Sequence, residues 1–180
     1  MVDNASDKNN KQICFKLHSY PNQFIQNDGR SGFWSGCYRG ARTTGEWGCA
    51  DTSFSMALNY WYKNNDVFKN NWDKLVASEK IPDTMSGYPC RIPKNNDGQK
   101  DYSPNPYTVL YFLNNKEMEV SDSKLCELGL KTVNGKNYCP LMKNGAWNTW
   151  ALVEFTKSLG LSMEPLTGII PIETGNLNKK

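Results

Sequence analysis

The sequence predicts an α+β domain, and three segments carry that prediction. Residues 13–19 alternate apolar and polar side chains, which is typical of a short strand. Residues 50–63 and 146–159 place their apolar side chains at helical spacings. Long segments rich in Gly, Pro and Asn separate these elements, so we expect helices and strands joined by irregular chain.

Length and composition fit one folded domain. The chain has 180 residues, of which 38% are hydrophobic and 12% aromatic, and this is enough to bury a core. We expect the domain to span residues 13–172, after a disordered leader at residues 1–12 and before a polar tail at residues 173–180. The net charge of +3 includes no basic run, which argues against a nucleic-acid partner. No apolar stretch approaches the ~20 residues of a membrane span.

The segment between the first strand and the first helix, residues 20–48, is a long glycine-rich loop. Loops of that length inside compact domains are usually functional. Its second half carries the aromatic residues Phe33, Trp34, Tyr38 and Trp47.

The helix at residues 50–63 is the clearest element of the chain. Asp51, Thr52 and Ser53 supply N-cap chemistry at its start. The apolar face of this helix is formed by Phe54, Ala57, Leu58 and Trp61.

The later elements follow from the same kind of pattern. A shorter helix is expected at residues 70–79, and residues 80–106 should be irregular. Residues 107–119 fit either helix or strand, with helix favoured. The helix at residues 146–159 is apolar over most of its surface, should be buried, and should end at Gly160.

Six cysteines and one histidine limit the chemistry of the chain. The histidine is His18, and the cysteines form no CxxC pair, so we expect neither a zinc site nor a cofactor. Three disulfides in a secreted protein is one interpretation. If Cys49 is free, at least one other cysteine must also be free or pair outside the chain. The compartment stays open, with a secreted or cell-surface location favoured over the cytoplasm.

Cys49 lies between Gly48 and the start of the predicted helix. Helix N-termini have unpaired N–H groups and partial positive charge, which favour a thiolate over a thiol and so favour a nucleophile. The same amides can bind a developing oxyanion. Gly48 leaves room for a substrate backbone to approach. A packing role is the alternative, because cysteine is among the most buried residue types.

Residues 26–62 resemble the nucleophile region of C39-like cysteine peptidases, in the papain-like clan. In that family a Gln, an Asp and a Trp precede a glycine-bearing loop, a Gly-Cys-Gly-Pro-Thr-Ser motif and a helix with Ala-Met. The matching residues here are Gln26, Asp28, Trp34, Tyr38, Gly40, Gly48-Cys49-Ala50-Asp51-Thr52-Ser53 and Met56-Ala57-Leu58. The chain departs from the family at Ala50 and Asp51. A weaker match covers Gly145-Ala146-Trp147 and Leu159-Gly160-Leu161.

The resemblance implies a papain-like fold, mainly its helical nucleophile-bearing part, and a role for each matched residue. Cys49 would attack a peptide carbonyl, and Gln26 would donate an N–H to the oxyanion, with Gln23 as the competing choice. A peptide or protein is the implied substrate. The residues expected to contact this substrate are Trp34, Trp47, Gly48 and Asp51.

The histidine that such a thiolate needs is absent after Cys49. Three interpretations stay open. The base is supplied by a missing C-terminal segment or a second chain, the chain is a degenerate relative that binds without cleaving, or His18 serves as base from an unusual position.

A secreted binding module, or an inactive peptidase homologue, is the competing function. The aromatic residues of the loop would then form its contact surface, because such residues dominate binding hot spots. This alternative predicts that Cys49 lies in a disulfide, with Cys37 as the nearest partner in sequence.

Overall fold

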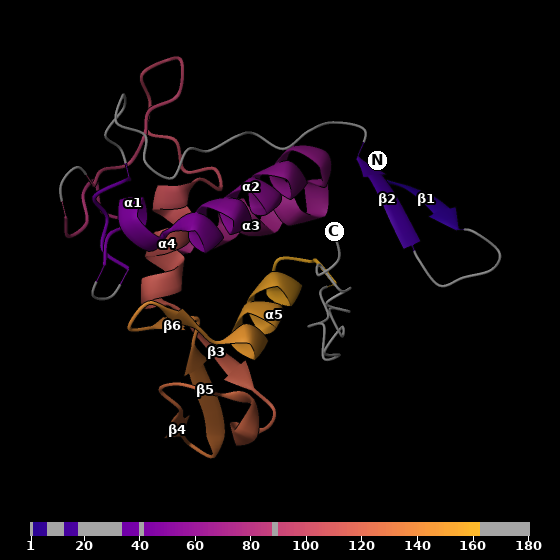
Figure 1. Ribbon diagram of the computed structural model, residues 1–180, viewed down its shortest axis with the longest axis vertical. Helices are drawn as coiled ribbons and strands as arrows, with labels where there is room; N and C mark the ends of the chain where they lie inside the picture. The colour runs from indigo at the N-terminus through magenta and orange to yellow at the C-terminus, as the bar shows by residue number, and fades with distance from the viewer. Residues whose placement is uncertain (1, 7–12, 18–33, 40–41, 88–89, 163–180) are drawn as a thin grey trace, which may run out of the picture.

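The computed structural model describes residues 2–6, 13–17, 34–39, 42–87 and 90–162. It is an α+β arrangement, as the sequence predicts, in which the five α-helices of the described residues are accompanied by small antiparallel sheets (Figure 1). Its elements in chain order are β1 (Val2–Ser6), β2 (Ile13–Leu17), α1 (Thr44–Trp47), α2 (Cys49–Asn64), α3 (Asp66–Ser78), α4 (Pro106–Asn115), β3 (Glu117–Val120), the 3₁₀ helix η1 (Ser123–Leu125), β4 (Lys131–Val133), β5 (Lys136–Pro140), β6 (Met142–Lys143), β7 (Ala146–Trp147) and α5 (Thr149–Ser158).

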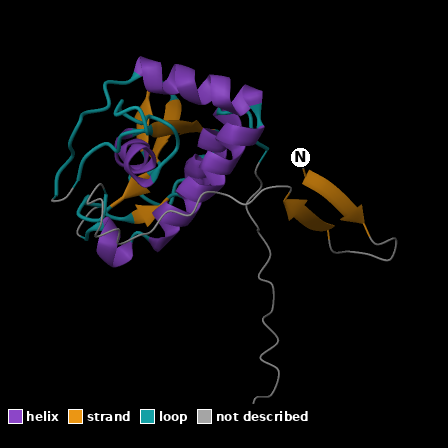
Figure 2. Cartoon of the chain, turned by 90° about the horizontal axis from the view of Figure 1, so that it is seen from above, coloured by secondary structure: helices purple, strands orange, loops and turns teal. Residues whose placement is uncertain are grey.

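Helices α2 and α3 lie side by side and are joined by one residue, Asn65 (Figures 1 and 2). Asn65 is extended, with φ −144°, and its side chain accepts a hydrogen bond from the Phe68 backbone N–H at 3.0 Å. It therefore ends α2 and caps α3. Because this cap sits at residue 65, α3 begins at Asp66 rather than at residue 70, where the sequence predicts its start.

Helix α4 is the centre of the core. Seven of its residues are buried, and the helix is capped by Asn105, whose side chain accepts from the backbone N–H groups of Tyr107 and Thr108. The Phe112 ring contacts Trp72 of α3 with centroids 5.3 Å apart and Phe155 of α5 at 6.1 Å. The predicted helix at 107–119 is thus confirmed up to Asn115, beyond which the chain enters β3.

The sheet of three strands has the order β3–β5–β4 and is antiparallel throughout. Helix α5 packs against β3, so the sheet joins the helical core from that side (Figure 1). Strands β6 and β7 form a separate hairpin whose turn, Asn144–Gly145, has positive φ at both residues. A two-residue turn of that kind matches the twist of a hairpin.

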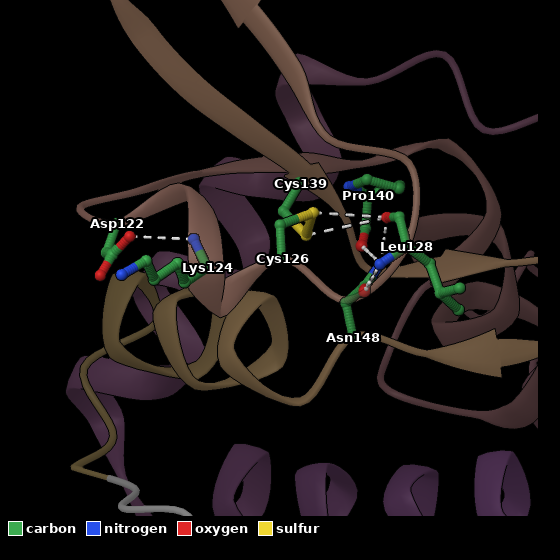
Figure 3. The surroundings of a disulfide bond; sticks show 7 residues. All are labelled: Asp122, Lys124, Cys126, Leu128, Cys139, Pro140 and Asn148. Atoms are coloured by element: carbon green, nitrogen blue, oxygen red, sulfur yellow. Dashed lines mark hydrogen bonds between the residues drawn. A yellow bond between two sulfur atoms is a disulfide. The ribbon is translucent and has the colours of Figure 1, made fainter.

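Asn148 fixes the point at which α5 starts (Figure 3). Its buried carboxamide accepts from the Leu128 N–H at 2.9 Å and donates to the Leu128 carbonyl at 3.0 Å and the Pro140 carbonyl at 2.6 Å. The Cys126–Cys139 disulfide lies beside this cluster. Because residues 146–147 belong to β7, α5 begins later than the sequence predicts. It is followed by Gly160, with φ +87°, as expected.

Strands β1 and β2 form an antiparallel hairpin in which Ala5 pairs with Cys14, and it stands apart from the helices (Figures 1 and 2). β2 confirms the strand predicted near residue 13. The leader at residues 1–12, expected to be disordered, contains strand β1. The sequence does not predict this strand, because its pairing with β2 cannot be read from composition. The expected tail, residues 173–180, lies outside the described residues. Among those residues, no helix has the length and apolar character to cross a membrane.

Candidate thiol site at the start of helix α2

Gly48 separates α1 from α2 and sets the place of Cys49. Its N–H donates to the Thr44 carbonyl at 2.8 Å, and its own carbonyl accepts from the Thr52 N–H at 2.8 Å. A Cβ at this position would meet the Thr44 side chain and would lie 2.5 Å from the Thr44 carbonyl oxygen. Only glycine therefore fits here, and α2 starts directly after it, at Cys49.

Cys49 is exposed and its thiol is free. It is the first residue of a helix of 16 residues, where the backbone N–H groups have no acceptor within the helix. A reagent from solvent can therefore reach the sulfur at the helix end that favours negative charge.

The other described cysteine side chains are paired. Cys37 bonds to Cys90, with Cα atoms 4.7 Å apart, and Cys126 bonds to Cys139, with Cα atoms 5.6 Å apart. The disulfide between Cys49 and Cys37, which a binding module would predict, is therefore not formed. The side chain of Cys14 lies outside the described part of the chain.

The loop that carries Cys37 also holds α1. Thr44 donates from its backbone N–H and from its hydroxyl to the Cys37 carbonyl, at 2.8 and 3.1 Å. At the start of α1, the Glu46 carboxylate accepts a hydrogen bond from the Thr43 backbone N–H at 2.9 Å. This bond lowers the pKa of the Glu46 carboxyl below its usual value. The Cys37–Cys90 disulfide is thus connected through α1 to the residue before Cys49.

Asp51 fastens the first turn of α2 to two other parts of the fold. It is fully buried, and its carboxylate accepts from Arg39 Nε at 2.5 Å and Nη2 at 3.2 Å. Its Oδ1 also accepts from the indole N–H of Trp147 at 2.9 Å. The loop of Arg39, the start of α2 and strand β7 therefore meet at one buried carboxylate.

The predicted site residues are only partly brought together. Gly48, Cys49 and Asp51 share the start of α2, with Cys49 exposed and Asp51 facing Arg39 and Trp147 rather than solvent. Trp34 is buried in the hydrophobic core. Trp47 ends α1, and its side chain is not described. Several residues of interest lie outside the described residues, namely His18, Gln23, Gln26 and Phe33.

Sequence reasoning did not identify Arg39 as the partner of Asp51. Arg39 is one of three arginines in the loop at residues 20–48, and nothing in the sequence shows which of them is buried. Trp147 belongs to the Gly145-Ala146-Trp147 match, but nothing in the sequence shows that its indole reaches α2. Thr52 is a further residue of this region, because its buried hydroxyl finds no hydrogen-bond partner among the described residues and lies one turn after Cys49.

The described residues contain no group of three or more His, Cys, Asp or Glu side chains arranged to hold a metal ion. Comparison of the chain with models of known protein families, with curated proteins and with solved structures gives no match.

Proposed function

We propose that this chain is the nucleophile-bearing part of a thiol-dependent peptidase that resembles the C39-like family and hydrolyses peptide or amide bonds. The observation that carries the proposal is the state of Cys49, an exposed free thiol at the first residue of α2. The four other cysteines with described side chains are paired in disulfides.

The surroundings of Cys49 support the proposal, because a nucleophile must be held in place. One residue before it, Gly48 packs against Thr44 too closely for any side chain. Two residues after it, Asp51 is tied to Arg39 and Trp147. The backbone at Cys49 is thus fixed from both directions, while the sulfur stays accessible.

The proposed chemistry is acyl transfer through a thioester. The Cys49 thiolate attacks the substrate carbonyl carbon, a C–S bond forms, and the backbone N–H of Cys49 and the Gln26 amide bind the oxyanion. An imidazolium gives its proton to the leaving amine as the C–N bond breaks. Water, deprotonated by the same imidazole, then attacks the thioester carbonyl, the C–S bond breaks, and the Cys49 thiolate and the imidazolium are restored.

The source of that imidazole is part of the proposal. We favour a histidine on a second chain or on a C-terminal segment, over a degenerate relative that binds substrate without cleaving it. A role for His18, which lies outside the described residues, is the third alternative. The two disulfides favour a secreted or cell-surface location, where such bonds persist.

Thiol labelling tests the role of Cys49. The matched control is the double substitution Cys49→Ser/Ser53→Cys, which moves the thiol one turn along the same helix to another exposed position. With iodoacetamide near pH 6 and no reductant, we expect Cys49 to be alkylated at least about tenfold faster than the thiol at position 53, because the unpaired N–H groups of the helix terminus face the position of its sulfur. The rates are read by peptide mass spectrometry.

Equal rates at the two positions would show that the start of α2 does not activate a thiol and would overturn the proposal. The double substitution keeps the number of thiols constant. A difference between the variants therefore reports position alone.

The oxyanion role is tested by a second pair, Gln26→Ala against Gln23→Ala. With a thioester substrate, which acylates Cys49 without a general acid, Gln26→Ala should slow acylation about 10²–10³-fold and Gln23→Ala should not. The opposite result would exchange their roles. His18→Ala tests whether His18 is the base. Peptide hydrolysis should be lost in this variant if His18 is the base, and kept if the histidine comes from a second chain or a C-terminal segment.

A binding module is the second candidate function, and Tyr38 is the observation that favours it. Tyr38 belongs to the aromatic loop and keeps 48% of its surface exposed, whereas Trp34 of the same loop is buried. A recognition surface on this loop would therefore include Tyr38 and exclude Trp34.

A further inference from the structure

A pocket of about 650 Å³ lies between three segments of the fold. One wall is Tyr38, the second is the irregular segment 82–86, and the third is the carboxyl end of α4 with Tyr111, Asn114 and Asn115. Its volume falls in the range of small-molecule sites, about 300–1,000 Å³. Neither Cys49 nor Asp51 lines it.

The walls are joined by covalent and hydrogen bonds. The Cys37–Cys90 disulfide connects the loop before Tyr38 to the chain that follows segment 82–86. The Tyr38 N–H donates to the Ser86 carbonyl at 3.2 Å, and Asn114 Nδ2 donates to the Tyr38 carbonyl at 3.1 Å. Each wall is therefore held against another, and the pocket is formed before any ligand arrives.

Gly87 brings two of the walls together more closely than a side chain would allow. Its φ is +110°, and a Cβ there would overlap the carbonyl of Gly36. A Cβ at Gly87 would also lie 3.3 Å from Cδ2 of the lining residue Tyr38, and Gly87 directly follows the lining residue Ser86. The shape of the pocket thus depends on a close backbone approach that glycine alone permits.

The lining residues carry no formal charge among those that the structure describes. They offer phenol, hydroxyl and carboxamide groups together with one methionine, and they are Tyr38, Pro82, Thr84, Met85, Ser86, Tyr111, Asn114 and Asn115. A phosphate or carboxylate ligand would find no cation in this lining, and the Lys116 ammonium near Tyr111 is already paired with Glu79 at 2.7 Å. A lipid chain would leave the amides and hydroxyls without partners.

Two of the lining residues, Asn114 and Asn115, carry carboxamides. Asn114 Nδ2 donates a hydrogen bond to the Tyr38 carbonyl at 3.1 Å, and Asn115 Nδ2 donates one to the Tyr111 carbonyl at 2.8 Å. These bonds orient both carboxamides, and each Oδ1 has no hydrogen-bond partner among the described residues. The last carbonyls of an α-helix such as α4 also find no N–H donor further along the helix. The end of α4 is therefore rich in acceptors for a ligand with several hydroxyl groups.

The tyrosines complete the pattern. Tyr38 is 48% exposed, and Tyr111 is half-buried, with a phenol whose pKa is raised by burial and by Glu79, so that it stays a neutral donor. The negative face of an aromatic ring attracts the slightly positive C–H groups on one face of a pyranose ring. The hydroxyls at the edge of that pyranose would meet the asparagine and threonine side chains.

We propose that this pocket binds a neutral saccharide, one or two pyranose units long, which lies on Tyr38 and hydrogen-bonds to Asn114 and Asn115. The ligand class follows from the match between neutral acceptors, hydroxyls and an exposed ring. The site does not depend on thiol chemistry at Cys49 and would serve a peptidase or a binding module equally.

The test is a titration of the full chain with a panel of neutral sugars, followed in its two-dimensional amide NMR spectrum. The panel is N-acetylglucosamine, its β-1,4-linked disaccharide, glucose, cellobiose, mannose and galactose. At least one sugar should bind with a Kd of about 1 mM or tighter, as a preformed neutral site of this size allows. The shifted amides should map to Tyr38, residues 82–87 and the end of α4.

Three substitutions give the proposal its controls. Tyr38→Ala should weaken binding about tenfold or more, and Tyr38→Phe should retain it, because the ring face and not the phenol carries the contact. Leu130→Ala changes another exposed apolar residue, 43% exposed and outside the pocket, and should bind like the parent.

Two results would overturn the proposal. One is the absence of binding to every sugar of the panel. The other is binding that Tyr38→Ala leaves unchanged. Because Tyr38 is exposed, its substitution should not unfold the chain, and the amide spectrum of the free variant checks this directly.

Discussion

The guanidinium of Arg39 and the carboxylate of Asp51 form a buried ion pair that joins a loop to the first turn of α2. The exposed fractions of the two side chains are 7% and 0%. The Trp147 indole donates to the same carboxylate at 2.9 Å. Asp51 is thus held by groups from two segments that are distant from it in sequence.

Removing one member of this pair should leave a buried charge without compensation. We expect Arg39→Met to lower the free energy of unfolding by about 3–5 kcal/mol. Arg42→Met is the matched control, because Arg42 faces Glu46 at 3.8 Å with about half of each side chain exposed, and it should cost at most about 1 kcal/mol. Urea unfolding followed by circular dichroism measures both. Similar losses in the two variants would mean that burial adds nothing to the Arg39 pair.

The two disulfides should contribute unequally to stability. They close loops of sequence separation 53 for Cys37–Cys90 and 13 for Cys126–Cys139. In the chain-entropy description the longer loop restricts the unfolded state more, by about 1 kcal/mol at room temperature. Replacing both cysteines of each pair by alanine, in separate variants, should therefore cost more for Cys37–Cys90. A greater loss of unfolding free energy in the Cys126/Cys139 variant would contradict this expectation. It would mean that contacts of this disulfide in the folded state outweigh the difference in loop entropy.

Gly87 should tolerate substitution far less than Gly98. Both have positive φ, +110° and +78°, but a Cβ at Gly87 would overlap the Gly36 carbonyl, while nothing lies within 4 Å of one at Gly98. Gly98→Ala should cost about 1–2 kcal/mol, the usual strain of a left-handed residue. Gly87→Ala should cost clearly more, because backbone must also move. The melting temperatures of Gly87→Ala and Gly98→Ala measure the two losses. Equal melting temperatures would contradict the close approach of Gly87 to the Gly36 carbonyl.

Tyr107 should make stability fall at alkaline pH. Its hydroxyl donates to the Pro82 carbonyl at 2.7 Å, and burial, with Asp83 and Tyr102 nearby, raises its pKa above the usual 10.0. A raised pKa means that the folded state holds the proton more tightly, so the contribution is complete below pH 10 and is lost as the pH rises above it.

The variant Tyr107→Phe isolates this contribution. It should lose about 1 kcal/mol at neutral pH, where the hydrogen bond is intact in the parent. Its free energy of unfolding should then decline less steeply than that of the parent between pH 9 and 11. Parallel pH profiles would show that Tyr107 does not couple its ionisation to folding.

The helices follow from local signals, and those signals are visible in the sequence. The apolar spacing of Phe54, Leu58 and Trp61 predicts α2 almost to its ends, and Gly160 marks the end of α5. The short strands were missed, because β3, β4 and β5 have three to five residues each and are stabilised by partners elsewhere in the chain. Pattern alone does not report such pairing.

The sequence by itself determined the α+β class, the main helices and the position of Cys49 at a helix start, because these depend on residues close together in the chain. Only the tertiary structure decided that Cys49 is free while Cys37 pairs with Cys90. It alone decided that Asp51, expected to contact substrate, faces Arg39 and Trp147. Disulfide partners and buried charge pairs depend on distances between segments far apart in sequence, and those distances exist only once the chain has folded.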